Sequence, residues 1–354
     1  MELTCLARSV CTASELSLLG RTRQCRLAPR LQERNVVRSG VLPSPSAIQQ
    51  SVKQESKRAR RPENVDGEFY VDRTCIDCDT CRWMAPTVFK NIYPQTAVYH
   101  QPESPEERLQ ALQALLSCPT ASIHTERPPK DIKDAHNSFP IPVDVDEIPG
   151  VYHCGYHSEA SYAAASYLIT RPEGNILVDS PRYSENLAKK IEELGGVRYM
   201  FLTHKDDVAD HKRWQARFGC ERILHELEVQ PHTQGVETKL QGEGPWTLGS
   251  DIDLIFTPGH TEGHVSLHLK RGKGVLFSGD HLSGNSSSEL ELSANLRVNW
   301  YNVKVQLESI QKLLPLEFTW ILPGHGRRRH YTSLEERDES IKSCLAKSNA
   351  STYN

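Results

Sequence analysis

The sequence predicts two domains in series: a small α+β domain that carries four cysteines, and a larger domain of short strands that end in metal-binding side chains. The first prediction rests on Cys75, Cys78 and Cys81, spaced two residues apart, and on a later Cys118 followed by proline. The second rests on four strand-like runs that each end at a histidine or aspartate. A chain of 354 residues, 38% of them hydrophobic, is long enough for two such cores.

Residues 1–62 have the composition of an organelle transit peptide followed by a disordered linker. Through residue 50 there are seven Arg, no Lys and no Asp, and no sustained apolar core typical of a secretion signal. The segment ends in a basic run over residues 57–61, for which a nucleic-acid or nuclear-import patch is the alternative. Its serine content favours the chloroplast stroma of a plant or alga, with the mitochondrion as the alternative.

Composition also limits the partners that we expect. A net charge of -3 gives no support for nucleic-acid binding. No apolar run approaches the roughly 18 residues that cross a bilayer, so we expect no membrane span. Of the ten cysteines, Cys154, Cys220 and Cys344 belong neither to the transit segment nor to the four-cysteine set. We expect them to be small buried residues or free thiols rather than a disulfide framework.

The cysteine spacing in residues 63–127 is typical of an iron-sulfur site. Thiolate sulfur suits cluster iron, and a tight loop presents three sulfurs to one face of a cluster. Two-cluster ferredoxins place a further cysteine before a proline where this chain has Ala85, so Cys118 is expected to complete a single cluster. Zinc, which prefers paired Cys-x-x-Cys units, and a disulfide are the alternatives. The prediction is a [4Fe-4S] cluster, with [3Fe-4S] as the alternative, on Cys75, Cys78, Cys81 and Cys118.

The segment from Val65 to about Ile123 resembles a single-cluster ferredoxin, which implies a ferredoxin-like α+β fold. The expected elements are a strand over Glu68–Val71, a second strand around Ala97–His100 and a helix over Pro105–Leu116. Residues 128–148 are expected to be a linker.

In residues 149–345 short apolar runs alternate with polar loops. Residues 167–170 and 175–179 predict a hairpin, residues 184–194 a helix, and residues 334–346 a closing helix before a tail over 346–354. A sheet fixes the backbone while the loops beyond its strands bring ligands together. The four strand-to-ligand units are 198–203 before His204, 253–257 before His260, 275–278 before Asp280, and 318–322 before His325.

These units resemble the metallo-β-lactamase superfamily over roughly residues 150–330, in its glyoxalase-II-like branch. The resemblance implies an αββα sandwich with a metal pair at one edge, and Asp179 as a support behind the ligands. By this resemblance, His204 and His260 would bind the first metal, Asp210, His211 and His325 the second, and Asp280 would bridge them.

The chain departs from the family motif His-x-His-x-Asp-His at one place. The stretch from His204 to His211 is two residues longer and lacks the middle histidine. We expect Asp206 or Asp207 to fill that position, and the other to cap a following helix. A carboxylate ligand there suits iron or manganese better than an all-imidazole set. If neither aspartate is a ligand, a single metal at the Asp210-His211 end is the alternative.

Other polar residues have predicted places in this domain. We expect His264 and His281 beside the metal ligands, and His268 on a strand surface. The arginines at 327–329 are interpreted as a solvated charge run, with an anionic ligand as the alternative. Residues that line the substrate entrance, or else lie on the surface, are His153, Tyr156 and His157.

The first functional prediction is a metal-dependent hydrolase of a small-molecule ester or thioester. One or two divalent metals, zinc, iron or manganese, would activate a water positioned by Asp280 and Asp210. The first alternative is a di-iron or mono-iron oxidoreductase fed by the cluster and a redox donor protein, although the chain lacks the flavin domain that such enzymes use. The second is a redox-sensing binding module with a degraded metal site.

Overall fold

The computed structural model describes residues 56, 58–286, 288 and 291–352. Nearly all of the predicted transit segment therefore lies outside the described residues. Those that are described belong to one compact unit that spans residues 54–354. In that part of the chain, no helix is both long and apolar enough to cross a membrane.

The first domain is built from two small antiparallel pairs and three helices packed on one core. The predicted helix is confirmed, since Ser104 and Glu107 form a reciprocal capping box at its start. The linker prediction for 128–148 is wrong in part, because a helix and an edge strand occupy it. The elements in chain order are β1 (Phe69–Val71), α1 (Thr80–Met84), β2 (Phe89–Ile92), β3 (Gln95–Val98), α2 (Pro105–Ser117), β4 (Ile123–Thr125) and α3 (Ile132–Asn137). They are followed by β5 (Ile141–Pro142), which pairs with a strand of the second domain.

The second domain contains a seven-stranded sheet in the order β11-β10-β9-β8-β7-β6-β5. The predicted hairpin is confirmed as the antiparallel pair β7–β8, and β8 to β11 run parallel. Its further strands are β6 (Val151–His153), β7 (Tyr167–Ile169), β8 (Ile176–Val178), β9 (Tyr199–Phe201), β10 (Glu221–His225) and β11 (Thr238–Leu240).

A six-stranded sheet in the order β12-β13-β14-β15-β18-β19 forms the other half of this domain. Strands β15 and β18 are parallel, whereas the other pairs are antiparallel. The strands are β12 (Trp246–Thr247), β13 (Ile252–Phe256), β14 (Val265–Leu269), β15 (Val275–Gly279), β18 (Trp320–Pro323) and β19 (Arg329–His330), with a small separate pair of β16 (Ser283–Gly284) and β17 (Leu292–Ser293).

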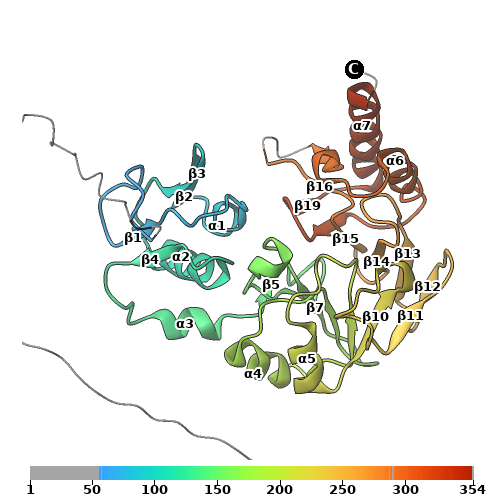
Figure 1. Cartoon of the computed structure of the whole chain (residues 1–354), viewed down its shortest axis with the longest axis horizontal. Helices are drawn as coiled ribbons and strands as arrows, with labels where there is room; N and C mark the ends of the chain where they lie inside the picture. Colours follow the sequence, from blue (N-terminus) through green and yellow to red (C-terminus); the bar gives the residue numbers. More distant parts are fainter. Residues whose placement is uncertain (1–55, 57, 287, 289–290, 353–354) are drawn as a thin grey trace, which may run out of the picture. The chain divides into compact units, whose positions relative to one another are not determined.

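Three apolar cores show that this domain has four layers. One core joins inward side chains of both sheets, such as Ile169 and Leu267. A second packs the outer face of the seven-stranded sheet against α4 (Glu185–Glu193) and α5 (His211–Phe218), and a third packs the other sheet against α6 (Val303–Gln311) and α7 (Leu334–Thr352). Figure 1 shows α4 and α5 on the opposite side of the strands from α6 and α7. The expected αββα arrangement is therefore present.

Two helix boundaries differ from the predictions. Helix α5 begins at His211 after Asp210, so neither Asp206 nor Asp207 caps it. Helix α7 continues to Thr352, so the predicted tail is helical as far as that residue. All four predicted strand-to-ligand units are present, and each ligand follows the carboxyl end of its strand. This places the ligand loops at one edge of the sandwich.

Candidate metal centre and cluster site

His204 is held by a chain of hydrogen bonds that begins at Asp179. The backbone N–H of Thr203 donates to Asp179 Oδ1 at 2.8 Å and its hydroxyl lies 3.0 Å from the same oxygen. The Thr203 hydroxyl also lies 3.0 Å from His204 Nδ1. This orients the ring so that Nε2, which has no hydrogen-bond partner, faces the ligand group. Asp179 is thus a support behind the ligands, and burial raises its pKa to about 7.

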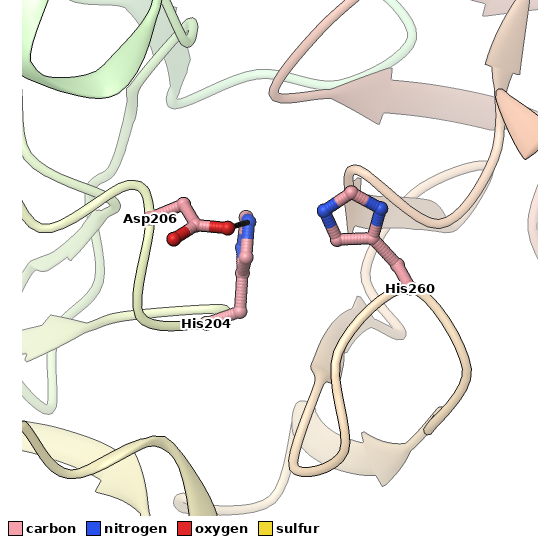
Figure 2. A group of neighbouring side chains, drawn as sticks. All are labelled: His204, Asp206 and His260. Atoms are coloured by element: carbon pink, nitrogen blue, oxygen red, sulfur yellow. Dashed lines mark ion pairs between the residues drawn. The ribbon is translucent and has the colours of Figure 1, made fainter. Parts of the chain in front are cut away.

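His204, Asp206, His260 and Asp280 form the first ligand group. His204 Nε2 lies 3.8 Å from Asp206 Oδ2 and 3.8 Å from Asp280 Oδ2. His260 Nε2 lies 3.7 Å from the same Asp280 oxygen. In Figure 2, His260 lies on a separate loop, and its imidazole is opposite the ion pair between His204 and Asp206. Asp206 therefore lies beside His204 and His260, in one of the two groups that could hold a metal.

Asp207 and His325 extend the group on the other side of Asp280. Asp207 Oδ2 lies 3.9 Å from His204 Nδ1, and His325 Nδ1 is 2.6 Å from Asp280 Oδ1. Gly324 permits this approach, because a Cβ there would meet Asp207 Oδ2 at 2.8 Å and Asp280 Oδ1 at 2.9 Å. Asp207, Asp280 and His204 form a second group whose ligand atoms all lie within 4.8 Å of one another.

The donor set fits a divalent metal. A metal with nitrogen and oxygen ligands at about 2.1 Å places those atoms roughly 3 to 4 Å apart, as the observed separations are. The buried atoms without partners include His204 Nε2 and both carboxylate oxygens of Asp207. Burial, followed by the nearby charge of Asp280, raises the pKa of Asp207 well above its ordinary value. Two buried carboxylates, Asp207 and Asp280, beside the partly exposed Asp206 call for a cation to stabilise them.

The structure places Asp210 and His211 outside both ligand groups. Asp210 Oδ2 accepts a hydrogen bond of 2.7 Å from the backbone of Tyr183. The His211 ring lies beside Arg222, 3.1 Å from Nδ1 to Nη1, at the start of α5. Asp207, three residues before Asp210, lies in a ligand group with His204 and Asp280 instead.

Two of the further histidines lie beside the ligands, and the third is buried elsewhere. His264 stacks on His281 with ring centroids 5.3 Å apart, and lies 5.3 Å from the His204 ring. The prediction of His268 on a strand surface is wrong, since it is 3% exposed and its Nε2 donates to the Glu317 carbonyl at 2.9 Å.

A cavity of about 660 Å³ opens onto the ligand group. His260, Asp206 and Asp280 form part of its wall. The rest is largely apolar, and includes Trp300, 68% exposed, and Tyr162, 76% exposed. The Trp300 backbone N–H donates to the His260 carbonyl at 2.9 Å, which fixes this aromatic residue next to a ligand. Exposed aromatic side chains beside a polar group are typical of a ligand-binding site. No sequence motif marks either residue, because each lies on a separate loop outside the strand-to-ligand units.

The four predicted cluster cysteines, Cys75, Cys78, Cys81 and Cys118, line one cavity in the first domain. Among the described residues, no three of their sulfur atoms lie within 4.8 Å of one another. Four cysteines around one cavity are the ligand type that an iron-sulfur cluster uses. Asp77 and Asp79 have φ of 57° and 69°, which bends the loop around the cavity. Cys154, Cys220 and Cys344 are buried free thiols, as expected.

The predicted entrance residues lie elsewhere. His153, Tyr156 and His157 are at most 4% exposed and none of them lines the metal cavity. His157 instead contacts the cysteine loop, with its Nδ1 3.2 Å from the Thr80 hydroxyl. The interpretation of the arginine run as solvated is also wrong at Arg327, which binds a carboxylate of that loop.

Two family models match this chain. Residues 71–125 match the 4Fe-4S single cluster domain of ferredoxin I, and residues 162–325 match the metallo-beta-lactamase superfamily. The chain therefore carries a metallo-β-lactamase superfamily domain after a 4Fe-4S ferredoxin domain.

Curated relatives align with parts of the second domain. A beta-lactamase-like protein 2 homolog of Drosophila melanogaster is 28% identical over 141 residues, 38% of this chain and 41% of the relative. A hydroxyacylglutathione hydrolase of Mesorhizobium japonicum is 34% identical over 110 residues, 30% of this chain and 42% of the relative. The chain thus spans less than half the length of these relatives.

Two solved structures are also similar to this chain, at lower sequence identity. A metallo-β-lactamase of Cronobacter sakazakii is 21% identical, with a TM-score of 0.42, over 62% of this chain and 96% of that one. A metallo-β-lactamase family protein of Thermus thermophilus is 19% identical, with a TM-score of 0.44, over 57% of this chain and 80% of that one.

Proposed function

We propose that the sandwich domain is a metal-dependent hydrolase for a small ester or thioester with an apolar or aromatic acyl group. The main support is that residues of the ligand group and exposed aromatic residues line the same cavity. His260, Asp206 and Asp280 line it together with Trp300 and Tyr162, so a substrate held by the aromatic residues would lie against the ligand group. One relative bears the name hydroxyacylglutathione hydrolase, which supports hydrolysis of a thioester.

When bound, a divalent metal lowers the pKa of its water toward roughly 7 and polarises the carbonyl of the substrate. The attacking group in this proposal is a water next to the carboxylates and histidines that line the cavity. Asp280 faces both His204 and His260 through Oδ2 and His325 through Oδ1. It is therefore the residue best placed to orient that water, together with Asp207 rather than Asp210.

The cavity wall supports the proposed substrate class. Trp300, Tyr162 and Val298 present apolar surface to a bound molecule, and burying such surface contributes about 25 cal/mol per Å². Lys205 also lines the cavity and lies beside the ligand Asp206. A carboxylate on the substrate would pair with this ammonium.

The test uses the full-length protein with its cluster. After removal of sandwich metal by a chelator, Zn²⁺, Fe²⁺ and Mn²⁺ are added back separately, and hydrolysis of 4-nitrophenyl phenylacetate and of 4-nitrophenyl acetate is measured. We expect one of the metals to restore turnover, with a preference for the aromatic acyl group. Asp280→Asn should abolish it, whereas Asp253→Asn, which changes a strand-surface ion pair with Lys270, should not. No turnover with any metal, or full turnover by Asp280→Asn, would contradict the proposal.

A second candidate, an iron oxidoreductase that receives electrons from the cluster, is favoured by one observation. Asp206 supplies a carboxylate where an imidazole was expected, which suits iron or manganese. Iron that survives purification in the sandwich and is reduced when the cluster is reduced would support this candidate over the hydrolase. A sandwich that binds none of the three metals would instead favour the sensor alternative.

A further inference from the structure

Two residues of the cysteine loop form hydrogen bonds or ion pairs with side chains of the sandwich domain. Asp79 and Thr80 lie between the second and third cysteines of the cluster site, Cys78 and Cys81. Their side chains meet residues that lie more than 70 positions later in the chain. Both contacts lead toward His325, the ligand-group histidine that faces Asp280.

The first contact is a bidentate ion pair between Asp79 and Arg327. Arg327 donates from Nε to Asp79 Oδ2 at 2.6 Å and from Nη2 to Oδ1 at 2.9 Å. The Asp79 side chain is 14% exposed, so the pair is largely shielded from solvent. Arg327 follows His325 by two residues, and its backbone exchanges two hydrogen bonds with Gly284. A change at Asp79 therefore acts on a segment with fixed geometry.

The second contact runs through Thr80 and His157. The Thr80 hydroxyl lies 3.5 Å from Cys78 Sγ and 3.2 Å from His157 Nδ1. His157 is fully buried, and burial lowers its pKa to about 3, so the ring is neutral. Nδ1 lies 2.7 Å from the Ala163 carbonyl, which only accepts, so Nδ1 carries the hydrogen. The Cys78 thiol donates to the Thr80 hydroxyl. A cluster-bound Cys78 would carry no thiol hydrogen, and the Thr80 hydroxyl would then donate to its sulfur.

This second route also ends at His325. The carbonyls of Ser161 and Tyr162, next to Ala163, each lie 3.2 Å from His325 Nε2. His325 Nδ1 in turn lies 2.6 Å from Asp280 Oδ1. The chain of contacts from Cys78 to Asp280 is continuous through hydrogen bonds and one short piece of backbone.

We propose that these two contacts couple the cofactor sites, so that metal binding in the sandwich changes the reduction potential of the cluster and the oxidation state of the cluster changes the metal affinity of the sandwich. One-electron reduction of the cluster by an external one-electron donor adds negative charge beside Asp79 and Thr80. The electron stays on cluster iron, and no other bond forms or breaks.

The direction of the effect follows from charge. Hydrogen bonds to the sulfurs and nearby charges set the potential of a cluster. Metal binding at the sandwich adds positive charge and fixes His325, and through it the loops of Arg327 and Ala163. The added positive charge favours the reduced form of the cluster, because that form is the more negative one. By thermodynamic reciprocity, the reduced cluster must then bind sandwich metal more tightly by the same factor. This inference holds whether the sandwich is a hydrolase or not.

The experiment is a potentiometric titration of the full-length protein, with the reduced cluster followed by EPR. The protein is compared after loading with Zn²⁺, which is not redox-active, and after chelation. We expect zinc to raise the midpoint potential by about 40 mV or more, the equivalent of a fivefold coupling at 59 mV per tenfold for one electron. In the double variant Arg327→Gln and Thr80→Val the difference should fall to within error.

The matched control is Arg217→Gln, which removes another bidentate arginine–carboxylate pair, with Glu192. It should keep the full zinc effect, and Thr80→Ser, which keeps the hydroxyl, should as well. If the double variant loses the cluster, Arg327→Lys, which keeps the charge but not the two-point geometry, replaces Arg327→Gln. Equal potentials with and without zinc in the unmodified protein, or an undiminished shift in the double variant, would overturn the proposal.

Discussion

Thr203 joins Asp179 to His204, because its hydroxyl lies 3.0 Å from a carboxylate oxygen of the first and 3.0 Å from Nδ1 of the second. Thr203→Val keeps the shape of the side chain and removes this link. We expect sandwich metal affinity to fall about 10- to 100-fold, as for other partners that orient a metal-binding histidine. Competition with a chromophoric chelator would measure it. Thr238→Val, which removes a hydroxyl on an exposed part of β11, should leave the affinity unchanged.

Asp206 and Asp207, rather than Asp210 and His211, are expected to contribute to metal binding. Asp206→Asn and Asp207→Asn should each weaken it by an order of magnitude or more, since each removes an anionic ligand atom. Asp210→Asn retains an oxygen that can accept from the Tyr183 backbone, so it should bind metal normally. Metal content after dialysis distinguishes the two pairs, and loss of metal only in Asp210→Asn would contradict the observed geometry.

Gly324 is expected to be essential for the ligand geometry although it supplies no ligand. In Gly324→Ala the new Cβ would lie under 3.0 Å from oxygens of both Asp207 and Asp280, so at least one carboxylate must move. We expect metal affinity to fall about tenfold or more. Gly235→Ala is the control, because its Cβ would meet nothing closer than 3.9 Å. Calorimetric titration with Zn²⁺ would compare the two.

Four cysteines, and no others in the described domains, are expected to hold the cluster. Alanine at Cys75, Cys78, Cys81 or Cys118 should remove the visible absorbance of the cluster and most of its iron. Cys154→Ala and Cys220→Ala should retain both, because these thiols are buried in the sandwich core. Retention of a full cluster in Cys118→Ala would show that another residue supplies the fourth ligand.

Trp300 is expected to bind the apolar part of the substrate. Trp300→Ala should raise KM for an aromatic ester about tenfold with little change in kcat, since burial of a large side chain against a ligand is worth about 1.5–3 kcal/mol. Tyr93→Ala, which removes an exposed aromatic residue outside the cavity, should change neither constant. Steady-state kinetics with the loaded protein would test this, and an equal effect of both substitutions would contradict it.

Much of the fold could be predicted from the sequence because its signals are local. The Ser104 capping box marks the start of α2, and the alternation in β7 places Tyr167 inward and Leu168 outward. Each ligand follows a β-rich run, which was enough to place His204, His260, Asp280 and His325 at strand ends. The ligands after His204 could not be predicted in the same way. An insertion changes which aspartate lies near the ligand group, and the local sequence pattern does not report the distance from each aspartate to that group.

The amino-acid sequence by itself predicted the two domains, the four cysteines of the candidate cluster site and four residues of the candidate metal group. These predictions follow from the spacing of residues along the chain, because turns and strand ends are specified by short local stretches of sequence. Only the tertiary structure decided that Asp206 and Asp207 join the group while Asp210 and His211 do not. It alone brought Trp300 to the cavity and Arg327 to Asp79. These pairings depend on how distant loops converge at one edge of the sheets, and such convergence is fixed by packing of the whole core rather than by any local run of residues.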